Sequence, residues 1–214
     1  MTSVERRMRE REGIRRAILD ATKELFATED CEKVSMRRIA EKIDYSPTAI
    51  YLHFKSKGEL MDALAAEGFA LLATALEAVQ ADDPTERLRR RGHAYVDFAL
   101  SNRPAYRIMF VLGDHPQDLY EGHNSHRTWS AHAFDILVST VREIKELEEN
   151  AVPASSDAAM LAAGVFWAHL HGVVSLVLTG RGRLFTEMQQ QLCRQAVDTA
   201  VAGLIALALA PADA

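Results

Sequence analysis

The stretch that decides the fold is residues 34 to 60, VSMRRIAEKIDYSPTAIYLHFKSKGEL. Its apolar residues recur at helical spacing in two short runs separated by a turn, which predicts two short helices with one buried side. This side is formed by Val34, Met36, Ile39, Ala40, Ile43, Ile50 and Phe54. Polar and cationic side chains remain for the other side: Ser35, Arg37, Arg38, Thr48, Tyr51, His53, Lys55 and Lys57. A helix-turn-helix with such a surface is typical of proteins that read DNA.

Local signals predict where these helices begin. Ser35 is a suitable N-cap for the first helix, and Ser46 followed by Pro47 opens the second, where the missing N–H of proline does no harm. Asp44 lies in the turn and tolerates a left-handed backbone better than most non-glycine residues. Residues 56–59 (SKGE) form a capping box that opens a further helix and brings the flanking lysines to its positive end. We expect a second phosphate contact there.

Composition predicts an all-α fold of about nine helices. The chain of 214 residues is rich in Leu, Ala, Glu, Arg and Met, and it lacks alternating β-branched runs. We expect a three-helix, helix-turn-helix DNA-binding domain over residues 1–56 and a larger helical ligand-binding and dimerisation domain over residues 57–214. Helices outside the motif are predicted at residues 11–27, 57–80, 84–102, from 104, and at 126–148, 156–179 and 184–208, with a loop over 113–125.

Charge is distributed unevenly along the chain. The formal net charge is -5, yet residues 1–58 contain 13 Lys and Arg against 10 Asp and Glu, and residues 59–214 contain 12 against 20. The basic excess predicts a polyanion partner for the N-terminal part. Four arginines precede the packed part of the first helix and form either a basic arm on phosphate or a solvated terminus: Arg6, Arg7, Arg9 and Arg11.

The features that bear on location predict a cytoplasmic protein without a membrane partner. Cys31 and Cys193 are the two cysteines and form no CxxC pair, which favours a reducing compartment and buried thiols. The charged N-terminus lacks the apolar core of a signal peptide. The longest apolar stretch, near residues 201–212, is shorter than the roughly 20 residues that span a bilayer.

Contacts with a double-stranded DNA operator are predicted for both helices of the motif and for the start of the helix that follows. We expect the bases to be read by Thr48, Ala49 and Tyr51, because threonine and alanine methyls can meet a thymine methyl. Ser46 and Pro47 hold the first turn rigid. Phosphates are assigned to Ser35, Arg37, Tyr51, His53, Lys55 and Lys57.

The last two predicted helices are rich in Ala, Gly and Val, which lets helices approach closely. Together with two helices of a second copy they predict a homodimer with a four-helix bundle; the alternative is an ordinary intramolecular core. A two-fold dimer doubles the base contacts and requires half-sites about 34–36 Å apart. The predicted interface comprises Ala158, Ala162, Val165, Val173, Ala196, Ala200 and Leu204.

Aromatic residues of the C-terminal part form either a ligand pocket or ordinary core. The candidate pocket has aromatic walls and one titratable group, and comprises Phe98, Tyr106, Phe110, Trp129, Phe134, Trp167 and His171.

A metal site and an enzyme are the competing interpretations. Histidines 115, 123, 126 and 132 lie near Asp114, Asp118 and Glu121, but exposed histidines of a polar loop explain the cluster without an ion, so we expect neither metal nor cofactor. No nucleophile elbow, P-loop, dinucleotide fingerprint or HExxH motif is present, which argues against an enzyme. Alternatives are a helical small-molecule-binding protein or enzyme that uses the aromatic and histidine pocket without operator control, and a module for protein interaction alone.

The segment SMRRIAEKIDYSPTAIYLHFKSKGEL resembles the DNA-binding region of tetracycline-repressor-like (TetR-type) transcriptional regulators. The matching elements, in order, are Ile39-Ala40, Ser46-Pro47, Tyr51, His53-Phe54-Lys55, Ser56-Lys57 and Glu59-Leu60. The segment departs from the usual pattern at Asp44 and Tyr45, where glycine and a small apolar residue are commoner, and at Ala49, where threonine is frequent. Without that hydroxyl, Thr48 and Tyr51 must supply more of the recognition.

Further along, Trp167, His171 and Gly172 resemble the W…HG signature of one C-terminal subgroup of this family. The resemblance implies an all-helical homodimer whose C-terminal domain binds a small-molecule inducer in a cavity and thereby moves the two reading heads apart. We therefore expect a repressor that holds a palindromic operator and is released by its inducer.

Overall fold

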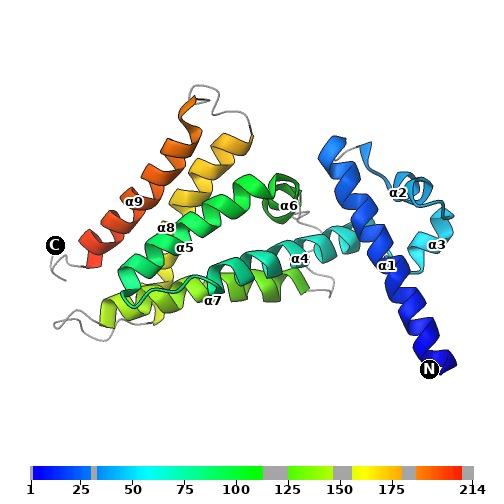
Figure 1. Cartoon of the computed structure of the whole chain (residues 1–214), viewed down its shortest axis with the longest axis horizontal. Coiled ribbons are helices and arrows are strands. Elements are labelled where there is room, and N and C mark those ends of the chain that lie inside the picture. The colour runs from blue at the N-terminus through cyan, green and yellow to red at the C-terminus, as the bar shows by residue number, and fades with distance from the viewer. Residues whose placement is uncertain (1, 30–32, 113–124, 147–155, 180–186, 209–214) are drawn as a thin grey trace. The chain divides into compact units, whose positions relative to one another are not determined.

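The computed structural model describes residues 2–29, 33–112, 125–146, 156–179 and 187–208, and within these ranges the regular elements are all helices (Figure 1), as the composition predicts. The helices are α1 (Ser3–Thr28), α2 (Met36–Lys42), α3 (Pro47–Tyr51), α4 (Lys57–Glu77), α5 (Pro84–Ser101), α6 (Arg103–Arg107), α7 (Ser125–Glu146), α8 (Ser156–Leu178) and α9 (Gln189–Ala208). A π-helical turn, Ile108–Leu112, follows α6. The predicted loop over residues 113–125 lies almost wholly outside the described residues.

The chain divides into two compact units, each made of two segments. The first unit contains residues 1–69 and 104–128, and the second contains residues 70–103 and 129–214. The helix α4 begins in the first unit and ends in the second. The sequence predicts a different division, into a DNA-binding domain that ends at residue 56 and a ligand-binding domain. That division concerns function rather than compactness, and it stays a prediction.

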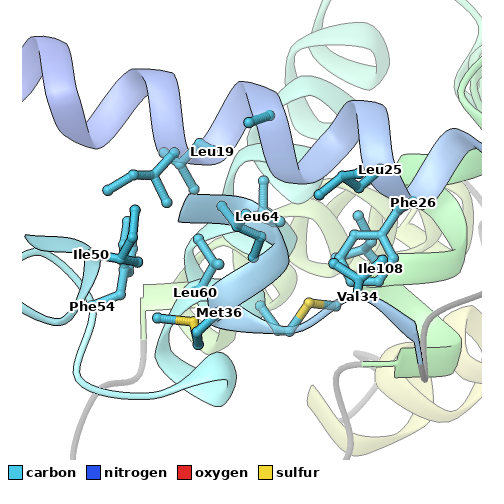
Figure 2. Close-up of a cluster of buried hydrophobic side chains, with 14 of the residues drawn as sticks. Leu19, Leu25, Phe26, Val34, Met36, Ile50, Phe54, Leu60, Leu64 and Ile108 are labelled. Atoms are coloured by element: carbon cyan, nitrogen blue, oxygen red, sulfur yellow. The ribbon is translucent and has the colours of Figure 1, made fainter. Parts of the chain in front are cut away.

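The core of the first unit lies between α1, the helix pair α2–α3 and the start of α4 (Figure 2). The apolar side predicted for the helix-turn-helix is confirmed, because six of its seven residues are buried and Ile43 is half-buried: Val34, Met36, Ile39, Ala40, Ile50 and Phe54. Ile108 also belongs to this core, although it lies far along the sequence. The core of the first unit is therefore completed by a residue that the sequence analysis placed in the C-terminal domain, residues 57–214.

The helix α1 begins at Ser3, eight residues earlier than the periodicity predicts. The Thr2 hydroxyl accepts a hydrogen bond from the Glu5 N–H at 3.3 Å, and the Glu5 carboxylate accepts one from the Thr2 N–H at 2.7 Å. This capping box satisfies two of the free donors of the first turn. The periodicity misses these turns because it follows buried residues, whereas the first turns of α1 are exposed.

In the second unit, α5, α8 and α9 pack against one another in pairs. Leu88 of α5, Val174 of α8 and Val197 of α9 are completely buried in this core. Gly92 allows the close approach, because a Cβ atom there would lie 2.8 Å from a Val197 methyl carbon. Burial of such apolar surface is the main favourable contribution to folding.

Within the second unit, arginines of α5 bond to the end of α4 and to α7. The Arg91 Nε donates to the Leu76 carbonyl oxygen at 3.2 Å, while its Nη1 donates to the Ile136 carbonyl oxygen of α7 at 3.0 Å and also to the Thr140 hydroxyl. The neighbouring Arg87 donates to the Ala81 carbonyl oxygen at 2.8 Å. The bond to Leu76 places a cation at the carbonyl end of α4, where the helix dipole favours it.

Candidate functional site

The turn of the helix-turn-helix has the predicted backbone. The Ser35 hydroxyl accepts from the Arg38 N–H at 3.2 Å, and the Ser46 hydroxyl accepts from the Ala49 N–H at 3.2 Å. Asp44 has a φ of 58°, which is the left-handed conformation expected of it. Both caps and the turn are thus confirmed, and α3 is held at its first turn and by the buried Ile50.

The outer face of α3 presents residues at both of its ends. Ser46, Pro47, Thr48 and Tyr51 are exposed, whereas Ala49 is half-buried. Leu52 is 73% exposed, the highest value among the large apolar side chains of the described residues. It follows Thr48 by four positions and therefore shares its face of the helix. Sequence reasoning missed Leu52, because an apolar residue in a helical pattern is normally assigned to the core.

Tyr45 also lies on this surface and was missed as a contact. Its side chain is 43% exposed and directly precedes the N-cap of α3. The signal was available in the departure at position 45, where the family usually has a smaller residue. The assignments of individual residues to bases or phosphates remain predictions.

The cations predicted to bind phosphate have different surroundings. Arg37 is exposed and donates to the Glu41 carboxylate at 3.0 Å. Lys57 is half-buried, with its Nζ 5.9 Å from the centre of the Phe26 ring. Lys55 is exposed. The motif therefore presents a graded set of cations: one in an ion pair, one over an aromatic ring and one open to solvent.

The start of α4 is capped by its own side chains. The Ser56 hydroxyl accepts from the Glu59 N–H at 3.1 Å, as predicted, and the Glu59 carboxylate accepts from the Lys55 N–H at 2.6 Å. The backbone of Lys55 is therefore held next to the positive end of α4. Because its backbone is held by this hydrogen bond, the Lys55 side chain starts from a fixed position.

His53 lies at the C-terminal end of α3 beside α1. Its side chain is half-buried, and its carbonyl oxygen accepts a hydrogen bond from Arg15 Nη1 at 3.4 Å. The guanidinium carbon of Arg15 lies 4.2 Å from the centre of the Phe54 ring. Burial lowers the pKa of His53 below its ordinary value, and the positive charges of Arg11 and Arg15 lower it further. Sequence reasoning missed Arg15, because no local pattern connects α1 to this position.

The predicted pocket residues belong to both units. In the first unit, Tyr106 and Phe110 have ring centres 4.7 Å apart, and Phe110 packs edge-on against Phe69 at 5.2 Å. In the second unit, Phe134 lies 6.4 Å from Trp167. Phe98 is buried in the second unit, and the Trp129 side chain lies outside the described residues.

A chain of hydrogen bonds crosses the pocket residues of the second unit. Trp167 lies 5.1 Å from the His171 ring, one helical turn away. The Tyr95 hydroxyl of α5 lies 3.1 Å from Nδ1 of His171, and the Ser175 hydroxyl lies 3.4 Å from its Nε2. Burial lowers the pKa of His171, so the ring is neutral at neutral pH. The W…HG residues thus combine an aromatic wall with a polar group that can donate or accept a proton.

The histidine cluster considered as a metal site is only partly described. His115, His123 and the side chain of His126 lie outside the described residues. His132 lies 2.8 Å from the Glu77 carboxylate in the last turn of α4. Within the described part of the chain, no three His, Cys, Asp or Glu side chains form a group that could hold a metal ion.

The predicted dimer residues occupy different faces of α8 and α9. Val165 is 55% exposed, and Ala158, Ala162, Val173 and Ala200 are half-buried. Ala196 and Leu204 are buried among their own chain's helices, and the predicted interface as a whole stays a prediction. The periodicity of α9 identified an apolar stripe but could not tell which neighbour covers it.

Among the described helices, α8 is the most apolar. By length and composition alone, its residues 157–178 could cross a membrane, and 28% of the 18-residue window of this segment is buried in the chain. Leu161 and Leu176 are among its exposed side chains. A soluble helix with a large exposed apolar face is also typical of a protein interface.

Cys193 is buried, as predicted for the two cysteines, and Cys31 lies outside the described residues. Burial raises the pKa of the Cys193 thiol, which keeps it protonated and unreactive at neutral pH.

Solved structures share this fold over most of their length. A Rhodococcus sp. RHA1 protein of unknown function is 25% identical, with 88% of this chain and 94% of that chain covered and a TM-score of 0.70. The TetR family transcriptional regulator PfmR from Thermus thermophilus is 21% identical, with 86% and 97% covered and a TM-score of 0.60. The T. thermophilus repressor FadR, in complex with lauroyl-CoA, is 15% identical, with 94% and 97% covered and a TM-score of 0.59.

Family models assign both parts of the chain. The model for bacterial regulatory proteins of the tetR family matches residues 18–64, and the model for the tetracyclin repressor-like C-terminal domain matches residues 88–200. No curated protein matches the chain. The C-terminal model alone spans more than half of the chain, and the N-terminal model covers the helix-turn-helix described above. The protein is a member of the TetR family of transcriptional regulators.

Proposed function

We propose that the protein is a ligand-responsive repressor that acts in the cytoplasm and binds a palindromic operator as a homodimer. The observation that carries this proposal is the outer face of α3, where Thr48 and Tyr51 are exposed on a helix fixed by its cap and by the buried Ile50. A rigid helix with exposed hydrogen-bonding side chains can enter the major groove and contact base edges.

The exposed face of α8 supports the homodimer. Leu161, Val165 and Leu176 are 71%, 55% and 51% exposed on a helix of otherwise apolar composition. Gly172 on the same face has nothing within 4 Å of the position a Cβ would occupy, so no contact within the described chain requires a glycine there. A mid-helix glycine costs about 1 kcal/mol relative to alanine, and close packing of a second copy explains that cost.

The cluster around His171 supports a small-molecule inducer in the second unit. Aromatic rings supply apolar contact area, and the Tyr95–His171–Ser175 chain supplies a polar group that can orient a ligand. FadR shares this fold and was solved in complex with lauroyl-CoA, which is consistent with an organic ligand for a protein of this fold. In the proposed mechanism, the inducer favours a dimer whose reading heads no longer fit one face of the duplex.

A footprint on the DNA that flanks the protein's own gene tests the operator proposal. We expect two protected half-sites related by two-fold symmetry, with centres about 34–36 Å apart or a multiple of that spacing. Substitution Thr48→Ala should reduce affinity for this site by the equivalent of about 1–3 kcal/mol while leaving binding to unrelated duplexes unchanged. Absence of any protected palindrome would contradict operator binding.

The same footprint repeated with small organic molecules tests induction. We expect at least one class of ligand to abolish protection by the wild-type dimer, and a Trp167→Ala variant to retain protection at the same ligand concentration. The ligand-free footprint of that variant is its control. If no ligand changes the protection, the protein binds DNA constitutively and the proposed induction is contradicted.

A further inference from the structure

We propose that Arg11 and Arg15 of α1, together with His53 at the end of α3, form a binding site for a phosphate of duplex DNA. The inference rests on the proposed DNA-binding function and adds residues of α1 to it. The first turns of α1 extend beyond the buried part of the first unit (Figure 1), where Arg11 is exposed. Partial burial of α1 side chains begins at Ile14, and full burial begins at Ile18.

Arg15 connects α1 to the end of the reading helix. Its Nη1 donates to the His53 carbonyl oxygen at 3.4 Å, and its guanidinium carbon lies 4.2 Å from the Phe54 ring centre. Phe54 is completely buried, so the guanidinium rests on a rigid surface. Arginine has five N–H donors, and this bond uses one of them, which leaves donors for a phosphate oxygen.

Helical spacing places Arg11 on the same face as Arg15. The two residues are four positions apart, so their side chains lie one turn apart on one side of α1. Arg7 continues this row by a further turn. Arg6 and Arg9 project from other sides of the same helix, because they are offset from Arg11 by five and two positions. Arg7, Arg11 and Arg15 thus form one row along α1, on the side of the helix that faces His53.

Among the described residues, no carboxylate neutralises the charges of Arg11 and Arg15, unlike those of several other cations of the first unit. Arg16 pairs with Asp20 and Glu67, and Arg38 pairs with Glu29 at 3.1 Å. Among the described residues, neither Arg11 nor Arg15 forms an ion pair. An uncompensated group of cations beside a DNA-reading helix is suited to phosphate, which gains most from unpaired charge.

The state of His53 supports the same site. The charged groups that act on its ring are Arg11 and Arg15, and both lower its pKa in addition to the effect of burial. In its own segment the next cation is Lys55, which is exposed. A phosphate between these groups would favour the protonated imidazole, which then donates a further hydrogen bond. Binding of duplex DNA should therefore raise the pKa of His53.

The test compares two variants of the full-length protein that lose the same charge from the same helix, Arg11→Gln and Arg9→Gln. Affinity for a mixed-sequence duplex is measured between about 50 and 200 mM salt, because sequence-independent binding reports phosphate contacts and requires no known operator. We expect Arg11→Gln to reduce the slope of log K against log salt by about 0.9 for each head engaged. Arg9→Gln should keep the wild-type slope.

A second measurement does not depend on affinity. The pKa of His53 is followed by NMR in the free variants and with the same duplex. Arg11→Gln should raise the pKa of the free protein and Arg9→Gln should not, while DNA should raise it in the wild type. The variant Arg15→Lys keeps the charge but loses the planar fork, so we expect weaker binding with an unchanged salt slope.

The outcomes separate the inference from the function on which it rests. Wild-type binding with equal slopes for the Arg11 and Arg9 variants, and an unchanged His53 pKa on binding, would overturn the phosphate site but leave DNA binding intact. If the wild-type protein binds neither this duplex nor the DNA flanking its gene, both proposals are overturned.

Discussion

The arginines of the second unit and those on one side of α1, Arg11 and Arg15, are used in opposite ways. In the second unit, Arg87 pairs with Glu143, Arg89 pairs with Asp198 at 3.0 Å, and Arg91 bonds to carbonyl oxygens of two other helices. In the first unit, Arg11 and Arg15 have no carboxylate partner among the described residues. The role of a cation therefore follows from the groups that face it: paired arginines hold helices together, and unpaired ones remain for a polyanion.

The largest effect should come from an aromatic pair at the end of α3, where one residue supports the fold and the other faces outward. We expect Phe54→Ala to lower the free energy of unfolding by about 3–5 kcal/mol, since the ring is completely buried. Tyr51→Ala should change it by no more than about 0.5 kcal/mol, since that side chain is 50% exposed, and should weaken duplex binding instead. Chemical denaturation measures both, and equal losses would contradict the division of roles.

Arg91 tests whether the arginines of the second unit serve packing. Arg91→Met should lower the free energy of unfolding by about 1–3 kcal/mol, because the Leu76 and Ile136 carbonyl oxygens and the Thr140 hydroxyl lose a charged donor. The matched variant Arg90→Gln removes a mostly exposed charge from the same helix and should change stability by less than about 0.5 kcal/mol. A reduced salt slope of duplex binding for Arg91→Met would break the comparison.

The turn before α3 should contribute less. Asp44→Ala should lower the free energy of unfolding by about 1 kcal/mol, because alanine at a φ of 58° lacks the local hydrogen bonds that help aspartate adopt the left-handed conformation. Glycine adopts this left-handed conformation without a steric cost, so Asp44→Gly should be at least as stable as Asp44→Ala. Thermal unfolding of the two variants measures the difference, and a more stable Asp44→Ala variant would contradict the turn geometry.

The smallest effect should be the pH dependence from His53 and His171. Both have a pKa below the ordinary value of 6.5 in the folded protein, so the unfolded chain binds more protons as the pH falls through 6.5. Their contribution to stability is complete above 6.5 and is lost as the pH falls from there towards the lowered values. Unfolding measured across this range should show a weaker decline in His53→Gln and in His171→Gln.

Duplex DNA should distinguish these two histidines. If phosphate raises the pKa of His53, the decrease in the free energy of unfolding that this residue causes at acid pH should disappear in the complex. The decrease that His171 causes should persist. The His171→Gln variant provides the control. The decrease in its stability at acid pH that is due to His53 should vanish when DNA is added. An equal decline with and without DNA would separate His53 from the phosphate.

Local features of the reading head could be predicted from sequence because their causes are local. Ser35 and Ser46 cap helices through bonds to residues three positions away, and Asp44 adopts its conformation within a single turn. The buried side of α2 and α3 follows from periodicity alone. The capping box at Thr2 and Glu5 was equally local, and it was overlooked because no buried stripe marks those turns.

Contacts between distant segments could not be predicted in this way. Nothing in the local sequence places Ile108 in the core of the head, Arg15 against His53, or Arg91 across two other helices. The same limit applies at Ala196 and Leu204, where the sequence shows an apolar stripe but not the helices that bury it. Pairing of helices depends on the packing of whole surfaces, which a single periodic segment does not specify.

The sequence by itself therefore determined the helices, the turn and the presence of a DNA-reading surface at residues 34–60, because hydrogen bonds within a few residues and a 3.6-residue period control them. Only the tertiary structure decided which cations remain unpaired. An arginine is neutralised or left open by side chains that fold next to it from elsewhere in the chain, as Arg11 and Arg15 show against Arg16, which lies beside Arg15 in sequence and yet is paired with Glu67.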